Sequence, residues 1–482
     1  MRVLLVFALI HVVGYLVLRI LAGQRSSLLP IELWGMSFGA GSGVFSLGLF
    51  YLAFWGLPLD FINVCILAAS LLGGSLLLWF VLEVRRGAHQ GSSAVAHPCD
   101  HGVSVHSPMS IVEWASVAIT SLCIVIVFAD AVSQPLVAFD ARAIWAFKAK
   151  VLYFEEGIYN EAFLDAERLH AKTRYPQLIP LTQALIASLS GGFDERVIKV
   201  MFPCFYVSLI LLVGWESGRE LGRRYGLAAT GLFASLPAFT IYANGGAASG
   251  YADLPLAFYV TALATRLLHW LQTGSASDLR LVALFTSLTL FTKTEGLALV
   301  FVVFFATAMA AWLVYERTLG RLWPLPSTAL GGMLFLTPWF LYQRQLPIVD
   351  EDFMKLLTIG NLLTGFDRLP YILGSFVKEF FLKPHLWNVL GFSAVFVFLR
   401  SPASAIHSRF GILLWSALLY LVLLCAIFLV IPWELEELLP VALSRLVMHI
   451  APLLFLWICF ELGNFRAENR FHLGLLTKRR SY

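Results

Sequence analysis

A series of apolar runs, each about the length of a bilayer crossing, constrains this chain more than any other feature. A transmembrane helix needs roughly 20 predominantly apolar residues, and runs of that kind fill most of the sequence. Hydrophobic residues make up 59% of the 482 positions and charged residues only 13%, and the mean hydropathy is +0.79. Soluble domains carry about 25% charged residues. We therefore predict an all-α, polytopic integral membrane protein.

The apolar runs divide into about thirteen predicted spans, if shorter ones are allowed inside a bundle. The first is interpreted as a retained span, because no small-residue cleavage site follows it. Five of the six cysteines lie in apolar runs, so no disulfide framework is expected. The net charge of +4 is too small to indicate a nucleic-acid partner. The predicted spans lie near 3–22, 31–57, 61–82, 111–132, 196–217, 226–243, 254–271, 279–292, 296–315, 326–342, 386–400, 410–431 and 445–463.

Basic residues assign the two sides of the membrane. Arginines cluster at alternate span ends, and such clusters in short loops face the cytoplasm. This places the N-terminus outside, the 83–110 linker inside, and the polar 135–195 loop outside. The 135–195 loop is itself rich in Lys and Arg, but long loops follow the positive-inside rule poorly. The arginines that set the orientation are Arg25, Arg85, Arg86, Arg219, Arg223, Arg224, Arg317, Arg321, Arg400 and Arg409.

A set of eight charged or ionisable residues lies at span ends or in loops on the predicted outer face. Charges in or beside a bilayer are costly and usually functional. Their placement on one face predicts a single site at the external membrane surface. Its members are Asp140, His170, Arg174, Asp253, Lys293, Glu295, Arg445 and His449.

Asp140 begins a helical pattern that ends near Gly157. Apolar residues from Ile144 to Phe154 form one stripe and Arg142 falls off it, which predicts an amphipathic helix in the interface plane. Asp is also a favoured N-cap, so capping is the structural alternative for Asp140. A carboxylate at the outer surface can act as a general base on an acceptor hydroxyl or amine.

The segment HAKTRYPQLIP precedes the next helical pattern. His170, Arg174 and Tyr175 lie just before its start, where free N–H groups and the helix dipole favour an anion. Pro176 or Pro180 suits the first turn of that helix. A solvated basic loop is the alternative.

Three further segments add charged groups on the outer side. Asp253 follows a glycine-rich turn, with helix capping as the alternative role. Lys293 and Glu295 lie in the turn TKTEG, which interrupts a long apolar run. Arg445 and His449 are four residues apart on one helix face, and cations on the outer side suggest a phosphate ligand.

The order of these motifs resembles that of the polytopic GT-C glycosyltransferases of bacterial membranes, the superfamily of protein O-mannosyltransferases and the lipid A aminoarabinose transferase. The resemblance covers roughly 111–463. It rests on FDARAIWAFKAKVLYFEEG, HAKTRYPQLIPL, GYADLPLAFY, TKTEG and SRLVMHIAP. It implies a large first external loop whose acidic residue, here Asp140, is catalytic. It also implies a polyprenyl-phosphate sugar donor and a bacterial cytoplasmic (inner) membrane location, with the active site facing the periplasm.

The resemblance also divides the chain. Residues 1–110 form a three-span extension with a cytoplasmic linker, 111–463 the catalytic module, and 464–482 a basic cytoplasmic tail. Some members have paired acidic residues where Ala141 follows Asp140 here, so a divalent cation remains an open alternative.

We therefore predict an enzyme that transfers a hexose or pentose from the lipid donor to an external lipid, glycan or protein acceptor by one inverting displacement. Asp140 is the predicted base. The predicted ligand contacts are Arg142, His170, Arg174, Tyr175, Asp253, Lys293, Glu295, Arg445 and His449. A membrane transporter or lipid flippase is the alternative, because these proteins also use intramembrane charges.

Overall fold

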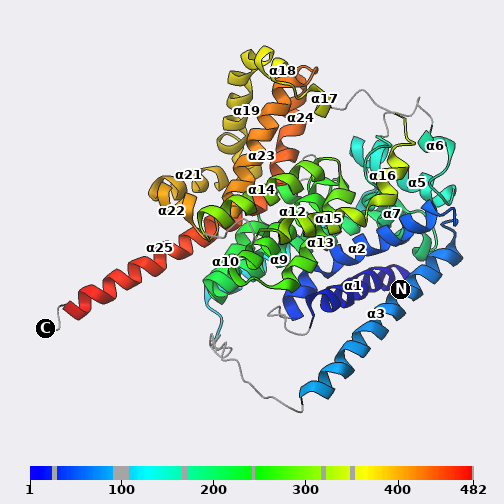
Figure 1. Cartoon of the computed structure of the whole chain (residues 1–482), viewed down its shortest axis with the longest axis horizontal. Helices are drawn as coiled ribbons and strands as arrows, with labels where there is room; N and C mark the ends of the chain where they lie inside the picture. Colours follow the sequence, from blue (N-terminus) through cyan, green and yellow to red (C-terminus); the bar gives the residue numbers. More distant parts are fainter. Residues whose placement is uncertain are drawn as a thin grey trace.

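The computed structural model describes residues 1–23, 30–90, 108–164, 172–240, 245–315, 322–347 and 353–479. Every regular element within these ranges is a helix (Figure 1). The all-α prediction is thereby confirmed for the part of the chain that the structure describes.

Eight helices are long and apolar enough to cross a membrane. A ninth span arises if two helices joined by a bend of 49°, α24 (Leu435–Met448) and α25 (Ala451–Arg479), act as one. The chain is thus a multi-pass membrane protein by helix length and composition. The eight helices are α1 (Arg2–Ala22), α2 (Pro30–Phe54), α3 (Phe61–Gln90), α4 (Ile111–Ser133), α9 (Met201–Leu221), α12 (Asp253–Thr273), α14 (Glu295–Leu313) and α23 (Gly411–Val430).

Shorter helices occupy other predicted spans. An 11-residue helix such as α15 (Pro324–Leu334) or α21 (Leu390–Arg400) is about 17 Å long, roughly half the hydrocarbon core. Helix α10 (Arg223–Ala234) has 12 residues and α13 (Ala276–Thr292) has 17. The total of thirteen crossings therefore remains a prediction.

Helix α12 is the centre of the bundle. Its apolar window is 100% buried by protein, whereas that of α3 is 11% buried and that of α4 is 17% buried. In Figure 1, α3 diverges from the bundle at one end. Because α3 and α4 leave most of their apolar surface uncovered by protein, they provide the surface that lipid would contact.

Small residues set how closely the first two helices pack. A β-carbon at Gly14 would collide with the Ser37 carbonyl, and one at Gly41 would collide with the Ile10 carbonyl. Glycine at these positions lets the backbones of α1 and α2 touch, as is common where helices pack in membranes.

The predicted helix after Asp140 exists in a different form. It begins as a π-helical turn, η1 (Ala141–Ala146), continues as α5 (Phe147–Phe154) and ends before Gly157. Asp140 makes no side-chain capping hydrogen bond, so the capping alternative is wrong. Asp253 is the first residue of α12 and makes no capping bond either.

The described remainder of the 135–195 loop contains three short helices. These are α6 (Glu161–Leu164), α7 (Leu178–Ser190) and, ending at the loop boundary, α8 (Glu195–Lys199). Pro180 lies in the first turn of α7, as the sequence predicts. Helix α5 packs on α7. Figure 1 shows α18 (Ile359–Thr364), α19 (Leu369–Phe381), α23 and α24 side by side at the top of the view. Helix α23 also packs on α14.

Candidate functional site

Asp253 is at the centre of a buried cluster of charged side chains. Its Oδ1 accepts hydrogen bonds from Lys293 Nζ and His449 Nε2, both at 2.9 Å. Its Oδ2 accepts a hydrogen bond from Arg445 Nε at 3.0 Å. The Asp253 residue is 0% exposed, and these three donors compensate its charge. The chain thus brings together the start of α12, the α13–α14 turn and the bend after α24.

Arg445 connects Asp253 to Asp140. Its Nη1 lies 2.7 Å from Asp140 Oδ2, and its guanidinium lies 4.4 Å from the centre of the Tyr251 ring. The Asp140 side chain is 23% exposed and that of Arg445 is 15% exposed, against 0% for Asp253. The Asp140–Arg445 pair is therefore more accessible than the Asp253 carboxylate.

Two glycines allow the loops to reach this cluster. Gly245 has a φ of +82° and lies against Arg445 and Asp253. Gly250 has a φ of +79°, and a β-carbon there would collide with Leu136 and crowd Ala141, the neighbour of Asp140. Glycine adopts positive φ without steric cost. The glycine-rich turn therefore lets the chain before α12 pack closely against η1.

Lys293 pairs with two carboxylates. It lies 2.9 Å from Asp253 Oδ1 and 2.7 Å from Glu295 Oε1. Burial lowers the pKa of Lys293, but the nearby Asp253 and Glu295 carboxylates outweigh burial and raise that pKa above its ordinary value. Lys293 is therefore a permanent cation at neutral pH.

His449 is held from both sides. A carboxylate only accepts hydrogen bonds, so His449 Nε2 must donate to Asp253. In the neutral imidazole, Nδ1 then accepts from the Tyr420 hydroxyl, 3.1 Å away. Tyr420 lies midway along α23, so the cluster contacts α23 near its middle.

The structure brings together most of the residues that the sequence singles out. The members found in the cluster are Asp140, Asp253, Lys293, Glu295, Arg445 and His449. Tyr175 lies close enough to Lys293 to interact electrostatically with it.

The other predicted ligand contacts lie elsewhere. Arg174 donates from Nη1 to the Leu346 carbonyl at 3.3 Å and makes no ion pair with the cluster among the described residues. The Arg142 side chain is exposed on η1 and has no ion-pair partner in the described ranges. His170 lies outside the described residues.

The net charge of the cluster is not positive, although the sequence suggests a phosphate ligand. The three carboxylates of Asp140, Asp253 and Glu295 face two permanent cations, Lys293 and Arg445. The sum, 2 − 3, is −1 when His449 is neutral. A preformed cationic pocket is thus not what the structure contains, and an anionic ligand would have to replace a carboxylate.

The sequence matches no known family model, and comparison with curated proteins finds no related sequence. The GT-C resemblance consequently rests on the order and placement of the motifs. Any function assigned to the chain therefore depends on the geometry of the cluster.

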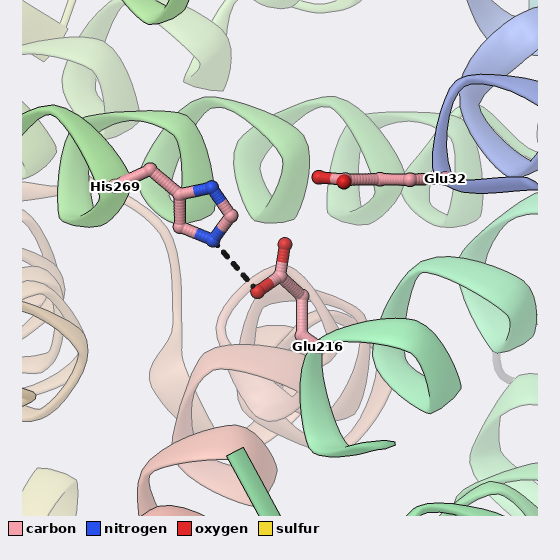
Figure 2. A group of neighbouring side chains, drawn as sticks. All are labelled: Glu32, Glu216 and His269. Carbon is pink, nitrogen blue, oxygen red and sulfur yellow. Dashed lines mark hydrogen bonds and ion pairs between the residues drawn. The ribbon is translucent and has the colours of Figure 1, made fainter. Parts of the chain in front are cut away.

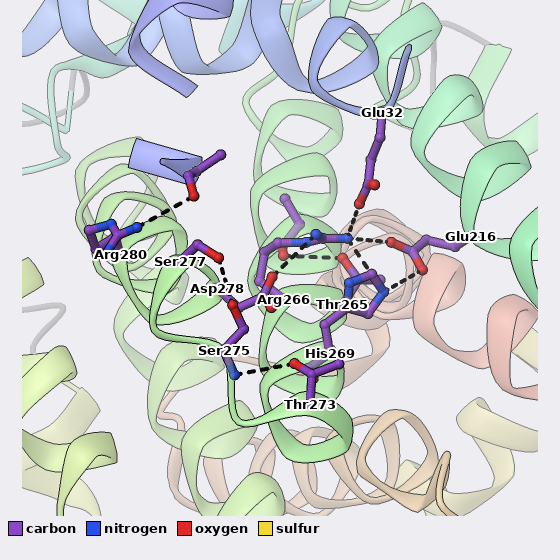
Figure 3. A network of polar contacts seen from close by, with 12 residues as sticks. Glu32, Glu216, Thr265, Arg266, His269, Thr273, Ser275, Ser277, Asp278 and Arg280 are labelled. Carbon is purple, nitrogen blue, oxygen red and sulfur yellow. Dashed lines mark hydrogen bonds and ion pairs between the residues drawn. The ribbon is translucent and has the colours of Figure 1, made fainter. Parts of the chain in front are cut away.

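A second buried network lies further along α12. Arg266 Nη2 lies 2.5 Å from Glu32 and 2.6 Å from Glu216, and its Nη1 lies 3.4 Å from Asp278. His269 Nε2 lies 3.0 Å from Glu216 (Figure 3). Arg266 is 13 residues after Asp253, or about 20 Å along the helix. Helix α12 therefore carries one charge network near each end.

Three of these residues are arranged as the ligands of a metal ion could be. Ligand atoms of Glu32, Glu216 and His269 lie within 4.8 Å of one another, and their side chains converge in Figure 2. The Arg266 guanidinium extends between the two glutamates, however (Figure 3). The position that a metal ion would take is already filled by this cation.

The sequence pattern did not predict this second network, nor the contacts of Tyr251 and Tyr420 with the cluster. Glu216 and Arg266 are charges within mostly apolar helices, Glu216 close to Arg219 and Glu220 at the end of α9 and Arg266 in α12, which begins with Asp253. A charge inside a predicted span was the available signal, but its partner depends on how the helices are rotated against one another.

Proposed function

We propose that this chain is a GT-C-type glycosyltransferase of the bacterial cytoplasmic membrane. It would transfer a sugar from a polyprenyl-phosphate donor to an acceptor on the outer side. The thirteen-span topology and the periplasmic orientation belong to this proposal. The observation that carries it is the Arg445 bridge, which joins the accessible carboxylate of Asp140 to the buried Asp253.

Asp140 is assigned the role of general base. It would take the proton from the acceptor hydroxyl or amine as that group attacks the anomeric carbon of the sugar. The bond from that carbon to the phosphate oxygen breaks, and the phosphate leaves with the bonding electrons. One displacement of this kind inverts the anomeric centre. The step needs a base on one side of the sugar and positive charge on the other.

Arg445 is assigned to the phosphate. Its Nε and Nη1 bind Asp253 and Asp140, while Nη2 has no hydrogen bond within the described part of the chain. A phosphate could take Nη2 and compete with Asp140 for Nη1, because guanidinium binds phosphate oxygens in a two-pronged manner. Donor binding would then release the Asp140 carboxylate next to the sugar.

The test compares Asp140→Asn with Asp194→Asn in a strain that lacks the native gene. Asp194 caps α8 through its side chain, and Asn caps nearly as well, so it is a matched control. Mass spectrometry of envelope glycans and lipids should show a missing sugar in the deletion strain. Asp194→Asn should restore it, and Asp140→Asn should lower turnover on the order of 10²-fold or more. Full restoration by Asp140→Asn would contradict the role of Asp140.

Transport of a lipid or solute is the second candidate. The Arg266 network favours it, because buried ionisable groups in spans often mark transport pathways. Its charges, however, are paired with one another. Proteoliposomes that move a fluorescent polyprenyl phosphate across the bilayer, with no change in the sugar, would support transport over transfer.

A further inference from the structure

The turn Lys172–Tyr175, just before α7, has an uncommon backbone. Lys172 has a φ of +49°, a left-handed conformation that few residues with a β-carbon adopt. The Tyr175 N–H closes the turn on the Lys172 carbonyl at 2.9 Å. Strained residues of this kind persist where the surroundings hold them.

Side chains from three elements hold this turn. Gln177 Nε2 donates to the carbonyls of Thr173 and Tyr175, at 3.3 and 3.1 Å. On α16 (Thr337–Gln343), Gln343 donates to the Arg174 carbonyl at 2.8 Å. Lys148, on α5, donates to the Lys172 carbonyl at 3.4 Å. Every carbonyl of the turn therefore accepts a hydrogen bond.

Of the side chains that bond to the turn, Lys148 is the one whose burial costs the most free energy, because it carries an amine into the interior. It is 0% exposed, and its ammonium lies 4.7 Å from the Trp145 ring centre and 5.7 Å from that of Tyr175. No carboxylate pairs with it among the residues that the structure describes. Burial lowers the pKa of Lys148 to about 7. An apolar side chain would fill the same place without this penalty, so stability does not explain a lysine here.

The turn carries Tyr175. The Tyr175 ring lies 5.9 Å from that of Trp145, centre to centre, and Tyr175 contributes to the raised pKa of Lys293. Lys148 therefore lies against both the backbone of the turn and the Tyr175 ring.

We propose that Lys148 is a positioning residue, which holds the turn Lys172–Tyr175 and the Tyr175 ring in place, so that Tyr175 contacts the phosphate of the donor. The contact with the donor rests on the function proposed above. The holding of the turn does not, because it concerns the protein without substrate.

The first experiment measures amide hydrogen exchange in peptides covering 172–177, without substrate. Lys148→Met should speed exchange of the Tyr175 amide about tenfold. The Lys172 carbonyl, which accepts the hydrogen bond of that amide, loses its second hydrogen bond from Lys148 in the variant. Lys150→Met is the matched control, since Lys150 is on the same helix, 46% exposed and paired with Glu195, and it should leave exchange unchanged. Unchanged exchange in Lys148→Met would overturn the proposal.

The second experiment is a double-mutant cycle on transfer from a short-chain polyprenyl-phosphate sugar. Lys148→Met should raise the donor KM about tenfold, more than it lowers kcat. If Lys148 acts through Tyr175, Lys148→Met combined with Tyr175→Phe should lose little more than the worse single variant. Additive losses would contradict positioning through Tyr175.

The two experiments separate the two proposals. A wild-type chain with no transfer activity would refute the proposed function and the contact of Tyr175 with the donor. The exchange measurement would still decide whether Lys148 holds the turn.

Discussion

Arg445 is the residue on which the cluster around Asp253 depends, since it binds two carboxylates and lies over an aromatic ring. Its planar guanidinium offers donors in fixed directions, which a lysine ammonium does not. Removing it would leave Asp253 with Lys293 and His449 as its remaining partners. The effect on ligand binding and the effect on the fold can therefore be separated by the choice of substitution.

We expect Arg445→Lys to weaken binding of a short-chain polyprenyl phosphate, because lysine keeps the charge but lacks the paired N–H donors of the guanidinium. Arg445→Ala should be worse, by about 2 kcal/mol or more, since hydrogen bonds to charged groups contribute about that much. Binding to purified variants in detergent, with melting temperature as the control for folding, measures both. Wild-type affinity in both Arg445→Ala and Lys293→Ala would place the phosphate elsewhere.

Lys148 makes stability depend on pH in a defined direction. Its pKa is lowered to about 7 in the fold from 10.5 in the unfolded chain. Between these values the unfolded state binds more protons, so this group makes the free energy of unfolding rise with pH. The slope is at most about 1.4 kcal/mol per pH unit, and the rise is complete near pH 10.5.

Melting curves of wild type and Lys148→Met between pH 6 and 10 test this, because the difference between them cancels other titrating groups. Near pH 6 the variant should be the more stable, and the difference should shrink as pH rises. A stability difference that stays constant with pH would contradict the lowered pKa of Lys148 in the folded protein.

At the scale of elements, α12 carries charges that only its neighbours can neutralise. Arg266 compensates glutamates from α2 and α9 and the aspartate of α13. Removing one partner of a buried ion network leaves unpaired charges, which typically costs 3–5 kcal/mol.

Arg266→Met should therefore lower thermal stability strongly, by about 3–5 kcal/mol in the free energy of unfolding. Adding Glu32→Gln should restore part of the loss, because Arg266 is the ion-pair partner that Glu32 has among the described residues and the variant removes the charge left unpaired. Arg224→Met, at an exposed site on α10, is the control and should change stability by less than about 0.5 kcal/mol. Thermal unfolding in detergent measures all three, and an unaltered melting temperature for Arg266→Met would contradict the role of Arg266.

At the scale of the whole molecule, the sequence predicted the helical class and most members of the cluster around Asp253. Lys293 and Asp253 could be found because they interrupt apolar runs on one predicted face. The charge balance could not be predicted, since pairing of Asp140 with Arg445 depends on the path of the glycine-rich turn. The buried positions of Lys148 and Arg266 depend on helix rotation, which hydropathy does not encode.

The predicted orientation is tested by cysteine labelling with a membrane-impermeant reagent, in a variant without native cysteines. A cysteine placed at Glu161 should react in intact cells, because the 135–195 loop is predicted to be outside. A cysteine at His106 should react only after the membrane is opened. The opposite pattern would reverse the assignment of sides and move the cluster to the cytoplasmic face.

Ion pairs near both ends of α12 have a mechanical consequence. A slide of one helical turn, about 5.4 Å, would break the contacts of Asp253 and those of Arg266 together. Helix α12 is therefore tied to its neighbours near both ends. A rearrangement that keeps both networks intact would leave α12 in place while other elements move around it.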